Sequence, residues 1–338
     1  MAATVGATKA YDLRGAAYSA VAVGPVREDL EDMIYDISPM DAWFLSNAKR
    51  GKASSTLHEW LTDSLTAAAS YAAVEGDGFS ATARTLPSRL KNYTQIARKD
   101  IEVTGTSQAV DTAGMASMMA YHTARAGKEL KRDMELDLLG DTPASAGGAS
   151  LSARVSAGME NWICTPNHIN MLVTAGTAAQ TGSTTVAHAS GFATGAVTDG
   201  SSTTTTETGL KAMLQQAWSK GGEVDTILTS PTIYNTISNF TGIATRFRNV
   251  ESRSQAQIIG AADVYVSAFG THQIRLSRYC GSTTLFCLDM NTWSVAYLRP
   301  FQVVDIAKVG DAERKMLLAE YCLVAHAPFG NTKATGVV

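Results

Sequence analysis

The chain has 338 residues, of which 45% are hydrophobic and 17% are charged. This length predicts about two domains, and so apolar a composition excludes a disordered protein and leaves room for large buried subunit contacts. The formal net charge of −3 argues against a protein whose main task is to grip nucleic acid, because such proteins carry a basic surface.

Secretion and membrane insertion are not expected. The first residues lack a charged and apolar leader pattern, and no run of about 18 apolar residues occurs. The sequon at Asn92 is given no weight, because glycosylation needs a secretory route. The cysteines show no CxxC spacing, which favours reduced thiols over a disulfide scaffold. They are Cys164, Cys280, Cys287 and Cys322.

The N-terminal part of the chain predicts an arm and a short helix. Residues 1–26 are small and polar without a sustained period, which is typical of an extended arm. Residues 26–35 carry apolar side chains near helical spacing, and Pro39 ends that pattern. Trp43 and Phe44 follow as an apolar pair that we expect to pack in a core.

Residues 49–106 predict a long two-stranded hairpin. Residues 56–61 have the pattern of one strand, and alternate apolar side chains over 93–103 predict the second. The polar stretch 67–90 connects them. Because an isolated hairpin is marginal in water, we expect a neighbouring subunit to cover this one.

Residues 108–139 predict one long helix with a single apolar stripe. Side chains of the stripe recur at steps of three and four: Ala116, Met119, Thr123, Ala126, Leu130, Met134 and Leu138. The opposite face is charged, and Lys131 and Arg132 stand four and three residues from Glu135, spacings that favour ion pairs on a helix surface. Gly140 supplies the C-terminal stop.

A small α/β unit is predicted after a low-complexity stretch. Residues 174–208 are nearly all Thr, Ala, Gly and Ser, which is typical of an irregular loop. An amphipathic helix follows, with Thr208 as its candidate cap. A short buried strand at 226–229 and a helix capped by Ser230 come next.

The last hundred residues are predicted to be mostly strands, and the tail at 328–338 a loose strand end. The predicted strands cover 264–268, 274–277, 284–288, 293–298, 302–307 and 316–325.

Motifs for catalysis or cofactor binding are absent from the sequence. It contains no Walker-type loop, no dinucleotide fingerprint, no nucleophile elbow and no HExxH. The six histidines are scattered, so no catalytic, cofactor or metal residue is predicted, and we expect no enzyme activity. A hydrolase that uses Ser, His and Asp without a recognisable motif stays open as a less favoured alternative. Basic residues of the hairpin region could contact DNA or acidic groups of a neighbouring subunit: Arg84, Arg89, Lys91, Arg98 and Lys99.

The order of these parts resembles the major capsid proteins of tailed bacteriophages, whose fold is named for phage Hong Kong ninety-seven. Several short segments are similar to the major head protein family that includes the coliphage SU-ten type. They are Ile37-Ser38-Pro39, Glu59-Trp60 with Asp63 and Leu65, Glu75-Gly76, Asn92-Tyr93-Thr94-Gln95-Ile96, Gly105-Thr106, Glu129-Leu130-Lys131-Arg132-Asp133, and Leu298-Arg299-Pro300-Phe301 with Gly310-Asp311-Ala312. The resemblance covers roughly residues 28–330.

The resemblance implies an α+β fold with an N-terminal arm, an extended hairpin loop, a peripheral domain with a spine helix, and an α/β axial domain. It divides the chain into six segments. These are the arm and short helix at 1–48, the extended loop at 49–106, the peripheral domain at 107–170 with its spine helix at 108–139, the low-complexity loop at 171–207, the axial domain at 208–290, and strands returning to the peripheral domain at 291–338. Candidate inter-subunit contacts are Glu59, Trp60, Arg84, Arg98, Lys99, Lys131 and Arg132.

The function implied by the resemblance is structural. Copies of the chain would form hexamers and pentamers of an icosahedral head around double-stranded DNA, which they touch weakly and without sequence preference. Portal, scaffolding and decoration proteins are the other expected partners, and no membrane is expected. The location would be the virion capsid, after assembly in the host cytoplasm. An encapsulin-like compartment that encloses enzyme cargo is the alternative within the same fold.

Overall fold

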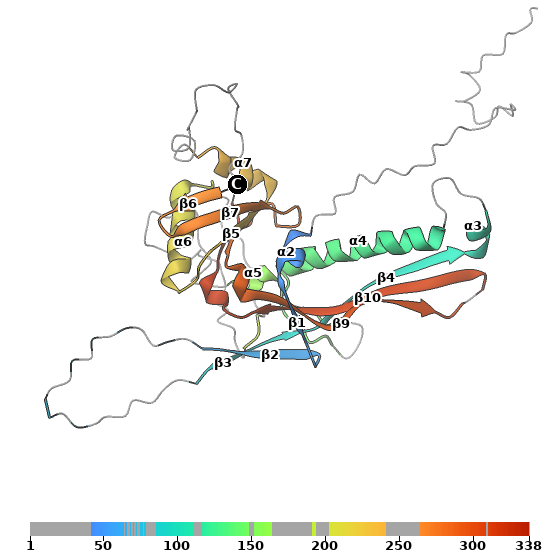
Figure 1. Ribbon diagram of the computed structural model, residues 1–338, viewed down its shortest axis with the longest axis horizontal. Coiled ribbons are helices and arrows are strands. Elements are labelled where there is room, and N and C mark those ends of the chain that lie inside the picture. Colours follow the sequence, from blue (N-terminus) through green and yellow to red (C-terminus); the bar gives the residue numbers. More distant parts are fainter. Residues whose placement is uncertain are drawn as a thin grey trace, which may run out of the picture.

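The computed structural model describes residues 42–63, 86–110, 117–148, 152–163, 191–193, 203–240, 264–308 and 310–337, with isolated positions between 64 and 85. An elongated body with a four-stranded sheet adjoins a rounded body with a five-stranded sheet (Figure 1). The predicted arm, the predicted helix at 26–35 and most of the low-complexity loop lie outside the described residues.

The elongated body is built on two long strands. The four-stranded sheet has the order β1-β9-β10-β4. Its strands are β1 (Lys49–Lys52), β9 (Trp293–Ile306), β10 (Ala312–Ala325) and β4 (Gln95–Thr104). The prediction of separate strands at 293–298 and 302–307 is wrong. The chain passes through Pro300 as one strand, because a register shift opposite Glu320 accommodates the proline.

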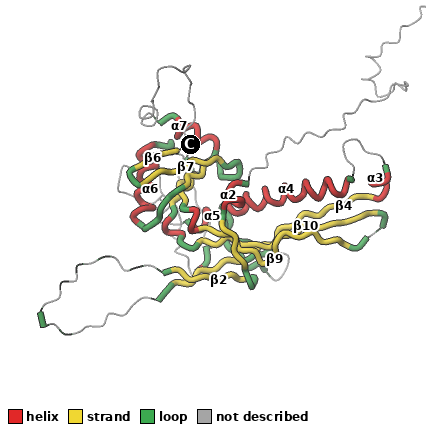
Figure 2. Tube along the Cα trace, viewed as in Figure 1, coloured by secondary structure: helices red, strands yellow, loops and turns green. Residues whose placement is uncertain are grey.

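The long helix α4 (Met118–Leu139) lies along β4 and β10 (Figure 2). Its predicted stripe is confirmed at Met119, Ala126, Leu130, Met134 and Leu138, which are buried, whereas Thr123 is half-buried. The predicted start at residue 108 is wrong, because a separate helix, α3 (Gly105–Ala109), ends in extended backbone at Val110. The apolar stripe has no member before residue 116, so periodicity never supported a helix over 108–115.

Glu135 does not lie on the charged face of α4, contrary to prediction. Its side chain is fully buried, and its two carboxylate oxygens accept hydrogen bonds from the backbone N–H groups of Phe44 and Leu45 at 2.8 and 2.7 Å. These amides belong to the short helix α2 (Trp43–Asn47), whose Phe44 side chain packs in the core as expected. Glu135 therefore joins the segment before the sheet to the C-terminal part of the long helix.

The hairpin pairs β2 (Leu57–Thr62) with β3 (Ser88–Tyr93). The predicted second strand at 93–103 is therefore wrong. The chain turns at Thr94, whose N–H donates to the carbonyl of Thr56, and the residues that follow enter the four-stranded sheet as β4. The apolar side chains do alternate over 97–103, but they do so because one face of β4 is covered by α4 and not because β4 belongs to the hairpin.

The rounded body contains a mixed five-stranded sheet with the order β11-β8-β5-β7-β6. Its strands are β11 (Thr332–Ala334), β8 (Leu285–Leu288), β5 (Thr226–Thr229), β7 (Gly270–Leu276) and β6 (Val264–Ser267). Two predicted helices pack against it, α6 (Glu207–Ser219) and α7 (Pro231–Ser238), and the cap of α6 is Thr206 in place of Thr208. Other short helices of the described residues are α5 (Met159–Trp162), η2 (Met290–Thr292) and η3 (Pro328–Gly330).

The C-terminal tail is not loose, contrary to prediction. β11 pairs with β8 in the rounded body, and residues 331–337 are all buried. The Asn331 side chain accepts from the N–H groups of Asp289 and the Trp293 indole and donates to the Ala327 carbonyl. This amide fixes the tail where β8 passes into β9.

Removing the Glu135 carboxylate tests its role in the core. Glu135→Ala should lower the free energy of unfolding by about 3 kcal/mol, because two buried N–H groups lose a charged acceptor. Urea denaturation followed by circular dichroism measures this change. Glu129→Ala, which removes the half-buried partner of the exposed Arg125 on the same helix, should cost less than about 0.5 kcal/mol. Equal effects of the two variants would contradict the assignment.

Candidate assembly surfaces

Trp60 fixes the base of the β2–β3 hairpin to the chain's own core. Its indole Nε1 donates to the carbonyl of Ala325 at 2.9 Å, and its ring lies 5.4 Å from that of the buried Trp162. Trp60 is half-buried in the described residues. The structure thus gives this candidate contact residue a role inside one subunit, at the point where the hairpin leaves it.

Asn92 anchors the second strand of the hairpin. Its amide nitrogen donates to the Leu323 carbonyl at 2.7 Å and to Ser156 Oγ at 3.1 Å, while its Oδ1 accepts from the Ala157 N–H at 3.0 Å. The side chain is fully buried. The sequence drew attention to Asn92 as a sequon and as part of a segment that resembles the capsid family, and only the fold reveals that it ties β3 to β10.

A buried carboxylate joins four segments next to these anchors. Glu320 of β10 accepts from Arg154, Arg299 and the hydroxyl of Thr94, each at 2.8 Å. Only 3% of its side chain is exposed, whereas the two arginines are partly open to solvent. A buried carboxylate is tolerated when charge and hydrogen bonds both compensate it, so this group positions the hairpin base.

Beyond its anchored base, the hairpin exposes apolar side chains. Leu61, Leu65 and Leu86 are 67%, 98% and 88% exposed. Exposed leucines on a projecting segment are typical of a surface that another protein covers. Glu59 sits among basic neighbours of the same ladder, 3.4 Å from Arg89 and 3.5 Å from Lys91.

The other candidate contact residues lie along β4 and α4 or outside the described residues. Lys99 forms an ion pair with Asp133 of α4 at 2.5 Å, so its charge is satisfied within the subunit. Arg98 points to solvent beside Asp100, Lys131 is exposed, and Arg132 is partly exposed. Arg84 is outside the described residues. Their contacts with other subunits remain predictions.

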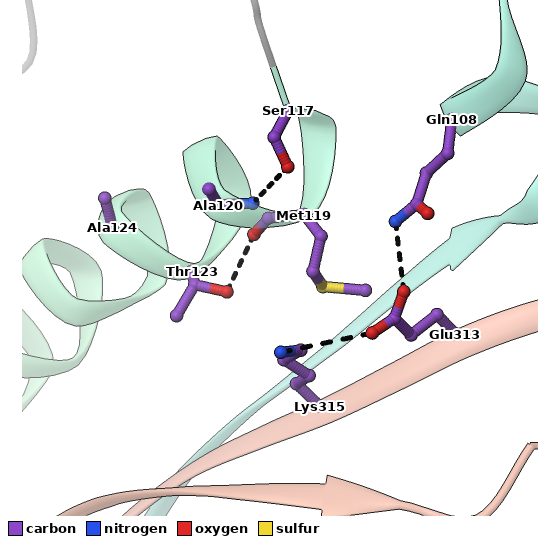
Figure 3. A pocket seen from close by; sticks show the side chains of 8 residues that line it. All are labelled: Gln108, Ser117, Met119, Ala120, Thr123, Ala124, Glu313 and Lys315. Carbon is purple, nitrogen blue, oxygen red and sulfur yellow. Dashed lines mark hydrogen bonds and ion pairs between the residues drawn. The ribbon is translucent and has the colours of Figure 1, made fainter.

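A hollow of about 580 Å³ lies between α3, the start of α4 and the tip of β10 (Figure 3). Its polar groups are already paired with one another. Gln108 donates to Glu313, Glu313 lies 4.0 Å from Lys315, and Ser117 caps the helix. Among the side chains drawn in Figure 3, no polar group is therefore left to bind a ligand in the hollow.

Two histidines of the described residues lie within hydrogen-bonding distance of a serine hydroxyl. His272 Nε2 lies 2.7 Å from Ser267 Oγ, but its Nδ1 is bonded to the backbone carbonyl of Val224, where a catalytic triad needs a carboxylate. His326 Nε2 lies 2.9 Å from Ser294 Oγ. Burial lowers the pKa of both histidines, so both are neutral at pH 7.

The described cysteines are buried free thiols. Burial raises the pKa of Cys287 and of Cys322 to about 12, which makes both unreactive at neutral pH. The described part of the chain contains no cluster of metal-ligating side chains and no helix long and apolar enough to cross a membrane.

A long helix against a sheet of long strands, a projecting hairpin and a rounded α/β body together define the phage capsid fold of the Hong Kong ninety-seven type. Solved structures with this fold are similar over nearly their whole length. The capsid subunit of cyanophage A-1(L) gives a TM-score of 0.67 at 12% identity and covers 92% of this chain and 97% of its own. The capsid of a native GTA particle gives a TM-score of 0.59 at 10% identity and covers 95% of this chain and 99% of its own.

The family follows from sequence. The family described as SU10 major capsid protein matches residues 5–338, and the chain belongs to it. A curated relative, the major capsid protein of Escherichia phage Phieco32, is 23% identical over 320 residues, which are 87% of this chain and 90% of the relative. The predicted family and α+β fold are confirmed, and the protein is a structural capsid protein of a phage and not an enzyme.

Two neighbouring residues of β2, one packed and one exposed, should contribute differently to folding stability. Trp60→Ala should lower the free energy of unfolding by about 3 kcal/mol, because a large ring leaves the core. Leu61→Ala should change it by less than about 0.5 kcal/mol, since that side chain is exposed. Urea denaturation measures both. A Leu61 variant that loses as much stability as the Trp60 variant would refute this assignment.

Charge changes at Lys131 test the α4 surface. Lys131→Glu should leave the melting temperature unchanged but raise the concentration needed for shell assembly by about tenfold. The reason is that a small loss of binding free energy repeats at every contact between subunits. Lys131→Gln should give an intermediate value. Light scattering follows assembly. Leu130→Asp, one residue away, should prevent folding by burying a charge. Normal assembly of Lys131→Glu would refute the interface prediction.

Proposed function

We propose that this chain is the shell-forming subunit of a tailed-phage head, assembling as hexamers and pentamers into an icosahedral shell around double-stranded DNA. Membership of the SU10 major capsid protein family over residues 5–338 carries this proposal. The structural neighbours support it as assembled shells, among them the satellite phage P4 procapsid, with a TM-score of 0.52 at 12% identity.

The architecture suits a subunit that works through contacts with its own copies. The hairpin base is fixed by Trp60 and Asn92, while Leu61, Leu65 and Leu86 remain exposed. A rigid base with an apolar projection favours contact with a neighbouring subunit, because the geometry is set before binding. Many such contacts, each weak, give a strong lattice.

The other proposed partners follow from the role of a phage shell. DNA would be held by weak, non-specific contacts, because the chain has a net charge of −3 and cannot grip a polyanion strongly. Portal, scaffolding and decoration proteins would join the shell, which would assemble in the host cytoplasm. The family match is to phage capsid proteins, so we propose a genome and not an enzyme as the content of the shell.

Assembly of the purified chain tests the function. Negative-stain microscopy should show shells, capsomers or tubes, and particles from infected cells should contain nuclease-resistant double-stranded DNA. A chain that stays a monodisperse monomer under all assembly conditions would overturn the proposal. Particles filled with an enzyme and free of nucleic acid would replace the phage head with a compartment.

A further inference from the structure

Three residues inside the low-complexity loop lie against the base of the hairpin. They are Gly191, Phe192 and Ala193, within the stretch 174–208 that the sequence predicts as an irregular loop. Gly191 and Ala193 are buried, and Phe192 is half-buried. These three residues are therefore packed against the body, although the composition around them carries no helix or strand pattern.

The strand that they meet, β3, has one edge without a strand partner among the described residues. β2 pairs with its other edge. Bonded pairs alternate along an antiparallel ladder, and the Thr94 N–H bonds to the Thr56 carbonyl at the end of this one. Counting back by twos makes Asn92 and Leu90 the residues bonded to β2. Arg89 consequently directs its carbonyl to the open edge.

Gly191 passes directly over this edge. A Cβ atom added at Gly191 would collide with the carbonyl oxygen of Arg89. The residue also has a φ of +86°, in the left-handed region that favours glycine. Both the space and the backbone conformation therefore require glycine at this point of the loop.

Phe192 covers the outward face of β3. Leu90 and Asn92 are buried. Because side chains alternate along a strand, Lys91 and Tyr93 point to the opposite face. The Phe192 ring stacks on that of Tyr93, with centroids 4.9 Å apart and planes 13° apart, and the Lys91 ammonium lies 5.6 Å from its centroid.

Ala193 holds the core side of the same strand. It is fully buried in the core cluster that also contains Leu90. Its carbonyl accepts from the Ala144 N–H at 2.9 Å. The three residues thus wrap β3 from its outward face, round its open edge, into the core.

This contact lies beyond the buried anchors of the hairpin. Trp60 and Asn92 bind carbonyls of β10, and the residue opposite Trp60 is Leu90. Arg89, which Gly191 approaches, is one residue nearer the projecting end. Aromatic stacking and a cation over an aromatic ring are modest interactions, and Phe192 is half open to water. The contact can therefore open while the buried anchors hold.

We propose that Gly191–Ala193 form a clasp that closes over the edge of β3, holds the hairpin against the body and opens without unfolding the body. The clasp gives the low-complexity loop a task that its composition does not reveal. Covering the edge also blocks its pairing with other chains. The inference concerns a single subunit and goes beyond the proposed function, which it does not require.

Hydrogen exchange of the unassembled chain tests the clasp. Phe192→Ala should speed exchange of the β2 and β3 amides by at least about tenfold, because local opening becomes easier. The β10 amides and the melting temperature should not change. Phe192→Tyr, which keeps the stacked ring, should exchange like the unmodified chain. Phe269→Ala is the matched control, because it removes a partly exposed ring that contacts Trp218 in the rounded body.

Glycine substitutions provide an independent readout. Gly191→Ala should reproduce the effect of Phe192→Ala, because the added Cβ meets the Arg89 carbonyl. Gly221→Ala places the same backbone strain, at a φ of +85°, in open space after α6 and should leave the hairpin amides unchanged. Unchanged exchange in either clasp variant, or faster exchange over the whole body, would overturn the clasp. Since these measurements need no assembly, the formation or failure of shells decides only the proposed function.

Discussion

The antiparallel ladder between β9 and β10 is the interaction on which the rest of the structure depends. Each strand has 14 residues, and one end of the ladder is buried at the junction of the two bodies while the other is exposed. β10 carries β4 on its free side and, through the carbonyls of Leu323 and Ala325, both anchors of the hairpin. One ladder therefore sets the direction of the helix, the sheet and the projecting hairpin together.

Buried carboxylates connect this ladder to segments that are distant in sequence. Glu135 binds the amides of α2, and Glu320 gathers Arg154, Arg299 and Thr94. Hydrogen-bond donors surround each carboxylate, and they offset the desolvation free energy that an unpaired buried charge would cost. Such sites specify geometry more than they add stability, because an apolar core could give equal stability without fixing direction.

The periodicity of apolar residues predicted the helices and strands whose pattern is local in the sequence. The stripe through Leu130, Met134 and Leu138, the strand at 226–229 and the helix starting after Ser230 were all readable, because burial repeats with the period of the element. Glu135 was not, because a carboxylate three or four residues from Lys131 and Arg132 looks like a surface ion pair until its distant donors are known. Asn92 and Asn331 were missed for the same reason.

For the candidate assembly surfaces, too, the sequence located whole segments but not the roles of single residues. The resemblance to capsid proteins located the hairpin and the long helix, but single residues could not be ranked without burial. Trp60 and Lys99 turned inward to their own chain, while Leu61 was exposed. Strand partners are pairings between distant segments, and one sequence carries no direct signal of them.

The pairing of β4 with β10 also has a consequence for synthesis. Their partners, such as Thr104 and Ala312, are more than two hundred residues apart in the sequence, and β11 at 332–334 contributes to the core of the rounded body. Neither sheet can close while the ribosome is still translating the segments before residue 312. A nascent chain consequently lacks the finished surfaces of a subunit, so neighbouring chains on one message cannot join into a lattice until residues 312–334 of each have been translated.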